Sequence, residues 1–341
     1  MAPSPDVPRD HPTPPSWQRT VAKYQSPDPW RSAWQILNTF LPYGLLWWLM
    51  VRSLEVSYWL TLALAIPAAG LMVRIFIIFH DCGHGAFFRS HRANDILGVL
   101  AGILTFTPYH QWRHSHAVHH ATAGDLDRRG VGDVWTLTVN EYRRLSPWRR
   151  VGYRLCRNPL VMFGVVPSVL FLVVHRVPRR PAGRRERVSV YGTNLALAAV
   201  VASMTLTIGF RAYALVQLPI GMIAGAAGVW LFYVQHQFAE VCWERRETWD
   251  YVRVALEGSS YYELPAVLRW FTGNIGFHHI HHLRPRIPNY YLQRCHAEAP
   301  SFHAVKPLTL RASLKSTRLH LWDEERRRLV GYSDLRTLPR R

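Results

Sequence analysis

Four long apolar runs constrain this chain more than any other feature of its sequence. They cover residues 34–51, 57–79, 190–209 and 213–234, and Arg74 is the single charged residue within them. A helix needs about 20 mostly apolar residues to cross the hydrocarbon layer of a bilayer. Because only a few residues separate the runs of each pair, the sequence predicts two helical hairpins in an all-α integral membrane protein with four transmembrane helices.

Two shorter apolar runs, residues 96–107 and 159–174, are harder to place. The first is too short to span a bilayer, and the second is of marginal length and contains two prolines. Arginine-rich segments at 143–157 and 176–188 flank the second run, and basic loops favour the cytoplasmic side of a membrane. We therefore expect both runs to be re-entrant or interfacial. The alternative is that all six runs cross the bilayer.

The regions outside the membrane domain, which covers residues 34–304, are expected on the cytoplasmic face. Residues 1–33 form a polar, Pro-rich segment without the apolar region of a cleaved signal peptide. Residues 305–341 form a basic, amphipathic segment. Within it, residues 307–322 have apolar and basic side chains at helical spacing, which favours a position in the membrane interface.

The charge balance is strongly basic, with a formal net charge of +19 from 41 Lys and Arg against 22 Asp and Glu. Such an excess suits either an anionic lipid surface or nucleic acid. The long apolar runs favour the lipid, so we expect a membrane and no nucleic-acid partner. The four cysteines are scattered without a CxxC pair, which is typical of neither a disulfide framework nor a zinc ribbon.

Nine of the 18 histidines follow a repeated spacing. HDCGH at 80–84 has two histidines four apart, while HAVHH at 116–120 and HHIHH at 278–282 each have three at i, i+3 and i+4. Residues three and four apart share one face of a helix, so each group would aim its imidazoles one way. The ninth histidine ends the fourth predicted span. The candidate metal ligands are His80, His84, His116, His119, His120, His236, His278, His281 and His282.

Helical geometry separates the neighbouring histidines from these faces. His279 is about 100° from His278 around a helix, and His114 is almost opposite His116. We therefore expect His110 and His114 behind the ligands or at the surface. The histidines treated as ordinary are His11, His91, His175, His296, His303 and His320. Five carboxylates lie near enough in sequence to orient the imidazoles. Each of them, taken singly, is better explained as a helix cap or a surface charge. They are Asp81, Asp125, Asp127, Glu240 and Asp250.

Nine imidazoles exceed the six positions around one first-row metal ion, so the sequence predicts two ions. A ligand set that is almost purely nitrogen suits iron, copper or zinc and disfavours magnesium or calcium. Zinc has no redox chemistry and usually takes four ligands. The residues by themselves leave the choice among these metals open.

The three histidine boxes resemble the signature of the membrane fatty acid desaturase family, HxxxH, HxxHH and HxxHH. The resemblance covers about residues 30–330 and extends to TPYHQWRHSHAVHHATAGDLDRRGVGD, GSSYYELPAVLRWFTGNIGFHHIHHLRPRIPNY and PLTLRASLKSTRLHLWDE. These stretches look like the bacterial and cyanobacterial branch that contains acyl-lipid delta-12 desaturases. The family implies a non-haem di-iron centre that activates O2, removes hydrogens from adjacent methylenes of a lipid acyl chain and leaves a cis double bond.

The resemblance also implies how the residues are used. The eight box histidines would bind two iron ions, and His236 maps onto a further ligand from the segment before the last box. Phe232 stands one helical turn before His236, where some acyl-CoA desaturases have an asparagine, so water would complete the coordination. We expect no fused cytochrome b5 domain and therefore a separate electron donor, such as ferredoxin with its reductase. The expected location is the bacterial inner membrane, with the active site on the cytoplasmic side.

Two other functions stay open from the sequence. A di-iron acyl hydroxylase, or another membrane di-iron oxygenase, would use the same oxidant to insert oxygen instead of removing a second hydrogen. A membrane metal-binding or transport protein is the non-enzymatic alternative. Transporters place polar ligands near the bilayer midplane, whereas these histidines lie at the ends of the predicted spans.

Overall fold

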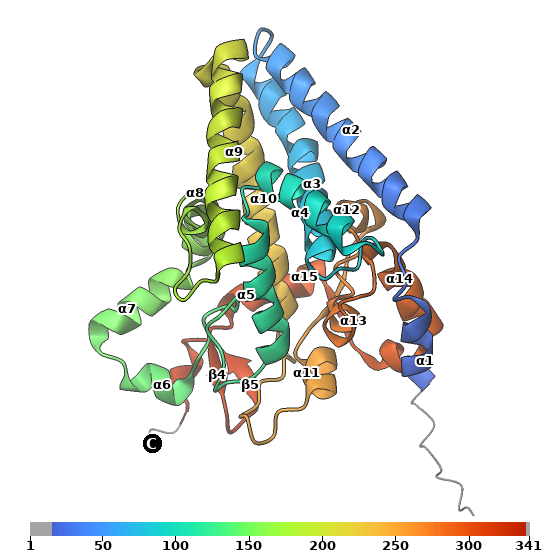
Figure 1. Cartoon of the computed structure of the whole chain (residues 1–341). Coiled ribbons are helices and arrows are strands. Elements are labelled where there is room, and N and C mark those ends of the chain that lie inside the picture. The colour runs from blue at the N-terminus through green and yellow to red at the C-terminus, as the bar shows by residue number, and fades with distance from the viewer. Residues whose placement is uncertain (1–15, 339–341) are drawn as a thin grey trace, which may run out of the picture.

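The computed structural model describes residues 16–338 and is mostly helical (Figure 1). Long helices extend from one end of the molecule, and short helices with two small sheets form a layer at the other end (Figure 1). The four long helices that correspond to the predicted spans are α2 (Pro29–Ser53), α3 (Tyr58–Gly83), α9 (Arg184–Ile208) and α10 (Phe210–His236).

Three of these helices, α3, α9 and α10, are both long and apolar enough to cross a membrane, judged over the described part of the chain. α2 is as long, but Gln35, Asn38 and Thr39 interrupt its apolar sequence. The side chains of Gln35 and Thr39 point into the protein and are buried. The outward face of α2 is apolar, with Leu41 and Leu45 more than half exposed, as expected for a helix that faces lipid.

Arg74, the charged residue within the predicted spans, is buried between three helices. Its Nε donates to Thr39 Oγ1 of α2 at 3.1 Å, and its Nη1 donates to the backbone carbonyl of Trp270. Trp270 belongs to the short helix α12 (Ala266–Phe271), and its ring lies 4.2 Å from the guanidinium carbon. A charge at this depth is tolerated because its donors are used inside the protein.

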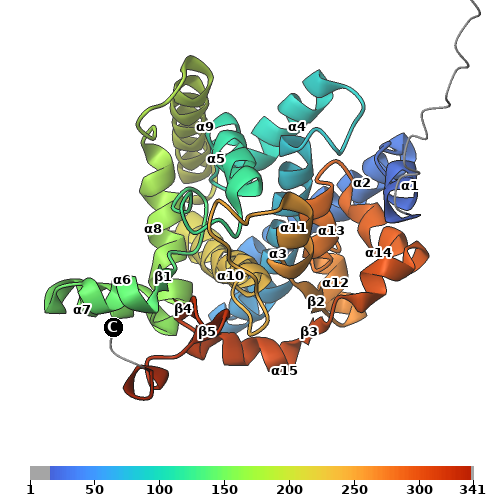
Figure 2. The same ribbon diagram turned by 90° about the horizontal axis from the view of Figure 1, so that it is seen from below.

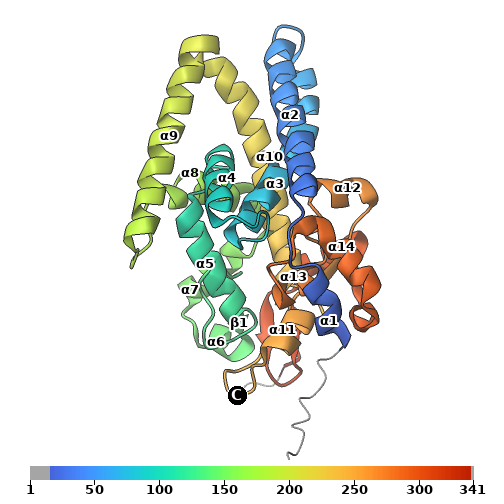
Figure 3. The ribbon, with the colours of Figure 1, turned by 45° about the vertical axis from the view of Figure 1, so that its right-hand side comes forward.

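The two hairpins turn close to the predicted positions. α2 and α3 are joined by residues 54–57. The sequence predicted the second turn at 210–212, but the structure places it at Gly209, which has a φ of +84°, a value that glycine adopts without strain. Residues 210–212 instead form the first turn of α10. From Gly209 the two helices diverge, as Figure 3 shows.

The two shorter apolar runs form short or broken helices. α4 (His91–Leu104) contains most of the first run, and its 14 residues extend about 21 Å, less than the hydrocarbon thickness. The second run follows α7 (Pro147–Cys156) and includes α8 (Val166–Leu172). α7 and the helical stretch Val161–Arg176 are bent by 59° at the break between them, the shape of a broken span or a re-entrant loop. The helical pieces next to α8 are the π-helical turn Val161–Val165 and the 3₁₀ turn Val174–Arg176.

The layer below the long helices is not purely helical, so the all-α prediction was wrong in this detail. Strand β1 (Leu137–Thr138) pairs in parallel with β4 (Leu321–Asp323), which pairs antiparallel with β5 (Arg328–Val330). Strand β2 (Tyr261–Glu263) pairs in parallel with β3 (Pro307–Thr309). Residues 307–322 therefore do not form one amphipathic helix. Their backbone is divided because its two ends pair with distant strands, a long-range contact that helical spacing cannot reveal.

Short helices complete this layer. They are α1 (Ser16–Lys23), α5 (Tyr109–Thr122), α6 (Val139–Arg144), α11 (Tyr251–Glu257), α13 (His278–Leu283), α14 (Asn289–Glu298) and α15 (Leu310–Ser313), with 3₁₀ turns at Pro300–Ala304, Leu314–Arg318 and Asp334–Arg336. Part of the predicted N-terminal segment is thus helical, while its residues 1–15 lie outside the described residues.

The helix α3 forms the centre of the core, and its contact with α4 and α5 depends on a glycine. A methyl group at Gly98 would lie 2.2 Å from a ring carbon of Tyr109, the first residue of α5. The hydroxyl of Tyr109 donates to the Cys82 carbonyl of α3 at 2.8 Å. We expect Gly98→Ala to lower the free energy of unfolding by about 1–3 kcal/mol through overpacking. Thermal unfolding of the solubilised protein measures this, with Gly192→Ala as the control, because nothing lies within 4 Å of that position. Equal stability of both variants would contradict the prediction.

Candidate metal centre

Four chain segments bring the nine predicted histidines together. His80 lies near the end of α3, and His84 follows that helix directly. α5 contributes three histidines, α10 ends at His236, and α13 contributes the last three. Figure 2, seen from below, shows α3, α5, α10 and α13 close together near the centre of the molecule. The i, i+3, i+4 spacing predicted on α5 and α13 is thus present on real helices.

The nine imidazoles divide into two groups. His80, His84, His116, His120 and His281 each offer one ring nitrogen to a first group, and these nitrogens all lie within 4.8 Å of one another. His119, His236 and His282 form a second group by the same measure. His278 joins this second group through its Nε2 atom, which is 3.0 Å from Nε2 of His236. Each group is of a size that can surround one metal ion.

Distances between the ring nitrogens match those of ligands on a common ion. Nε2 of His116 lies 3.0 Å from Nε2 of His80 and 3.1 Å from Nε2 of His120. Nε2 of His281 is 3.1 Å from Nε2 of His120. Two nitrogens bound at right angles, each about 2.1 Å from a metal ion, lie about 3.0 Å apart. The geometry therefore fits a transition metal with imidazole ligands.

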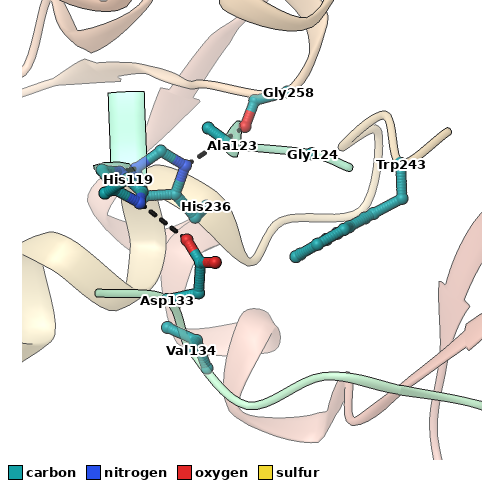
Figure 4. Close-up of a pocket in the computed structure, with 8 residues that line it drawn as sticks. All are labelled: His119, Ala123, Gly124, Asp133, Val134, His236, Trp243 and Gly258. Atoms are coloured by element: carbon teal, nitrogen blue, oxygen red, sulfur yellow. Dashed lines mark hydrogen bonds and ion pairs between the residues drawn. The ribbon is translucent and has the colours of Figure 1, made fainter. Parts of the chain in front are cut away.

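The hydrogen bonds on the far side of two of the rings also indicate a metal site. Nδ1 of His119 donates to Asp133 Oδ1 at 2.7 Å, and Nδ1 of His236 faces the Gly258 carbonyl at 3.3 Å (Figure 4). A neutral imidazole has one N–H, so the Nε2 atom of each ring carries a bare lone pair. These two Nε2 atoms face each other at 3.1 Å. Two lone pairs at this distance repel unless a cation lies between them, so the donor set fits a metal ion.

Burial keeps the imidazoles in the form that binds metal. The pKa values of His116, His120 and His281 lie well below the ordinary 6.5, first because burial disfavours the charged ring and then because neighbouring imidazoles repel a proton. His278 and His282 have pKa values lowered for the same reasons. These side chains are therefore neutral near pH 7, as metal ligation requires.

Asp133 is a residue that the sequence analysis missed. Its side chain is 6% exposed and accepts the bond from His119, which fixes the orientation of that ring. Asp133 lies 14 residues after His119 in a loop, with no helical spacing to connect them. A carboxylate that holds the far nitrogen of a ligand histidine is a common feature of metal sites. The sequence signal that could have found it is its place at the end of residues 107–133, a stretch that resembles the desaturase family.

Asp81, one of the predicted carboxylates, also faces a ligand candidate. Its Oδ1 is 3.3 Å from Nδ1 of His80, and its Oδ2 accepts from the backbone N and the Nδ2 of Asn289 at 2.7 and 2.8 Å. Asn289 exchanges two hydrogen bonds with Gln35 of α2, at 2.9 and 3.2 Å. This buried chain of contacts connects the polar face of α2 to the first group of histidines.

The other predicted carboxylates have structural roles. Asp125 accepts from the backbone of Asp127 and from Arg128, and Asp127 pairs with Arg245. Asp250 caps α11 by accepting from the backbone N of Arg253. Glu240 pairs with Lys306 at the surface. None of these contacts reaches an imidazole of the two groups.

The histidines that helical geometry excluded lie outside both groups. His114 is exposed, and its Nδ1 is 4.0 Å from a carboxylate oxygen of Glu186. His110 is partly buried, and its ring makes a T-shaped contact with Tyr109. His279 is fully buried, but its ring packs against Tyr261 and other aromatic rings instead of the ligand candidates. The exclusion of these three residues from the groups agrees with the sequence analysis.

A large cavity extends from the histidines toward the long helices. Its volume is about 780 Å³, and His80, His116 and His278 line it together with apolar residues of α3, α8 and α10. A second cavity, of about 10 Å³, lies beside His119, Asp133 and His236 (Figure 4). That volume suits a single water molecule. The site thus combines nitrogens that could bind metal, a place for one water and an apolar chamber.

Comparison with known proteins places this arrangement in a family. A model of the family described as fatty acid desaturase matches residues 57–309. A fatty acid desaturase of Bacillus subtilis (strain 168) is 49% identical over 94% of this chain and 91% of its own length. A Synechocystis protein named sn-1 acyl-lipid omega-3 desaturase (ferredoxin) is 28% identical over 69% of this chain and 64% of its own length. Another Synechocystis protein, named sn-1 oleoyl-lipid 12-desaturase, is 24% identical over 65% of this chain and 63% of its own length.

The fold and the site define a membrane protein whose histidine clusters can hold metal. The chain belongs to the fatty acid desaturase family and is an oxidoreductase of that family. The resemblance inferred from the three histidine boxes is therefore confirmed.

Proposed function

We propose that this protein is an O2-dependent desaturase that inserts a cis double bond into an acyl chain of a membrane lipid. The observation that supports the proposal most directly is the convergence of nine imidazoles, in two groups, at the end of an apolar cavity. A cavity of about 780 Å³ can hold an acyl chain. The names of the two Synechocystis relatives describe acyl-lipid and oleoyl-lipid substrates, which favours a lipid-bound chain here.

Two iron ions, held by the nine histidines, would supply the oxidising chemistry with O2 as co-substrate. The reaction removes one hydrogen from each of two adjacent methylenes and reduces O2 to two waters, so each turnover also takes two electrons from a donor and two protons from solvent. The protein contributes the arrangement. Asp133 and Asp81 hold His119 and His80 in place, and the buried, apolar chamber keeps water away from the reacting carbons. Such protection is needed because an oxidant strong enough to attack an unactivated C–H bond also reacts with other groups.

The proposed topology has four spans, α2, α3, α9 and α10, in the bacterial inner membrane with the histidines on the cytoplasmic side. The histidine groups lie at the same end as the arginine-rich residues 176–188, which favours that side by the positive-inside rule. A separate donor, ferredoxin with its reductase, would bring the electrons. The Synechocystis omega-3 relative carries the word ferredoxin in its name, and the strongly basic chain suits an acidic partner.

The delta-12 position of the double bond is the most specific part of the proposal. The relative named as a 12-desaturase is 24% identical, and the relative named as an omega-3 desaturase is 28% identical. The double bond position depends on how far the acyl chain enters the cavity, which has to be measured.

Expression in a bacterial host with monounsaturated lipids tests the proposal, with ferredoxin and iron supplied. We expect a new diene with a cis bond, detected by gas chromatography of the fatty acids with localisation of the double bonds. Hydroxylated acyl chains in place of dienes would favour the hydroxylase. An unchanged profile from membranes that contain the iron-loaded protein would refute desaturation, and zinc in place of iron would favour metal handling.

A further inference from the structure

The apolar part of the large cavity opens sideways. Its lining includes Leu172 at the end of α8, and Phe210, Leu218 and Met222 of α10. Each of these side chains is more than half exposed although it lines the cavity. α10 is a membrane-spanning candidate, so the opening between α8 and the diverging helices α9 and α10 (Figure 3) would face lipid hydrocarbon. A chain can therefore enter from the bilayer while a second chain of the same lipid stays outside.

The opposite part of the cavity is polar. Gln111 and Ser115 of α5 line it beside Arg179, which belongs to the basic loop at 176–188. The backbone N of Arg179 donates to Gln111 Oε1 at 2.9 Å, and its Nη1 donates to Ser115 Oγ at 2.8 Å. These two contacts fix the position of the arginine at the wall of the cavity. Ser115 is followed directly by His116, whose ring also lines the cavity.

Arg179 differs from the other arginines of this loop. Within residues 176–188, all of which the structure describes, Arg179 is the arginine that lines the cavity. It is exposed and forms no ion pair with any described carboxylate. Arg176, by contrast, is partly buried and uses its guanidinium on Asn194 and the Phe106 carbonyl. Arg179 is thus a fixed, unpaired cation beside an acyl-sized chamber.

We propose that Arg179 binds the phosphate of the glycerophospholipid whose acyl chain occupies the cavity. Guanidinium groups favour phosphate because several N–H donors match its oxygens, and the loop lies at the cationic end of the spans, where anionic head groups gather. This inference rests on the proposed desaturase function and deepens it by naming the substrate class. Because Ser115 precedes His116, a phosphate held there also sets how many carbons separate the ester from the histidines. Arg179 is thereby a positioning residue for the double bond.

The test uses the iron-loaded enzyme in vesicles with reduced ferredoxin. Three substrates carry the same acyl chain. They are phosphatidylglycerol, a galactolipid without phosphate, and the coenzyme A thioester, whose phosphates belong to a water-soluble carrier instead of a lipid head group. We expect the wild type to prefer phosphatidylglycerol. Arg179→Ala should raise the apparent KM for that lipid about tenfold, leave the galactolipid rate unchanged, and spread the product over several double bond positions. Arg179→Lys should restore part of the affinity, because it keeps the charge.

The neighbouring Arg180 provides the matched control, since it is exposed on the same loop but does not line the cavity. We expect Arg180→Ala to behave as the wild type. Equal kinetics and product positions for the Arg179 and Arg180 variants would overturn the proposal. So would a loss of iron from Arg179→Ala, which would indicate a structural role, or a wild-type preference for the thioester or the galactolipid. A wild type inactive on all three substrates would instead count against the desaturase function itself.

Discussion

Replacing His120 or His281 by alanine is expected to abolish desaturation. Both rings belong to the first group, and their Nε2 atoms are 3.1 Å apart. Each is buried against other imidazoles, so no solvent-exposed side chain can take the place of the lost nitrogen. We expect at least about a 100-fold loss of product, because even residues that only orient metal ligands typically contribute 10–100-fold. Fatty acid profiles and the iron content of the purified protein measure the effect.

His114→Ala is the control for this prediction. His114 lies on the same helix, α5, but its side chain is 65% exposed and lies outside both groups. We expect it to keep full iron content and activity. Membrane insertion of all three variants should be unchanged, since the long apolar helices are untouched. Normal desaturation by the His120 and His281 variants would show that these rings do not hold the metal.

Asp133→Ala is expected to remove mainly one of the two iron ions. Asp133 accepts the 2.7 Å bond from His119, a member of the second group, and no contact joins it to the first group. Without it, the buried Nδ1–H of His119 loses its partner and the ring is free to turn. Loss of such an orienting carboxylate costs about 10–100-fold in metal affinity or activity. We therefore expect iron to fall from two ions per chain toward one, with a matching loss of turnover.

Two variants sharpen this second prediction. Asp133→Asn keeps an oxygen that can accept from His119, so it should retain more iron than the alanine variant. Asp127→Ala removes a carboxylate of the same loop region that pairs with Arg245 instead of an imidazole, and it should behave as the wild type. Equal loss of both ions from Asp133→Ala would mean that the two groups do not bind metal separately. Full retention of iron would mean that Asp133 has no part in the site.

Helical periodicity explains why the gathering of the nine candidate histidines was predictable. The nine histidines were identified because three and four residue spacings predict a shared helix face, and α5 and α13 are helices at those positions. The hairpins were predictable because long apolar runs have few alternatives in a membrane. Both signals are local, so one sequence contains them in full. The exact turn at Gly209 was less visible, because a single residue with positive φ decides it.

The features that escaped prediction depend on contacts between distant segments. Residues 307–322 do not form the expected helix, because the two ends of this segment pair as strands with β2, and with β1 and β5. The polar residues of α2 lower its apolar content, and they make contacts inside the protein, as Gln35 does by donating to Asn289. Asp133 and Arg179 had no spacing that linked them to a helix face.

The sequence by itself predicted the apolar helices and nine candidate nitrogen donors from composition and periodicity, and its motifs indicated the family by resemblance. Only the tertiary structure decided how those donors divide into two groups, which carboxylate supports which ring, and which arginine lines the cavity. The physical reason is that metal ligation and hydrogen bonding act over about 3 Å. Contacts that short between residues far apart in the chain exist only after the helices have packed.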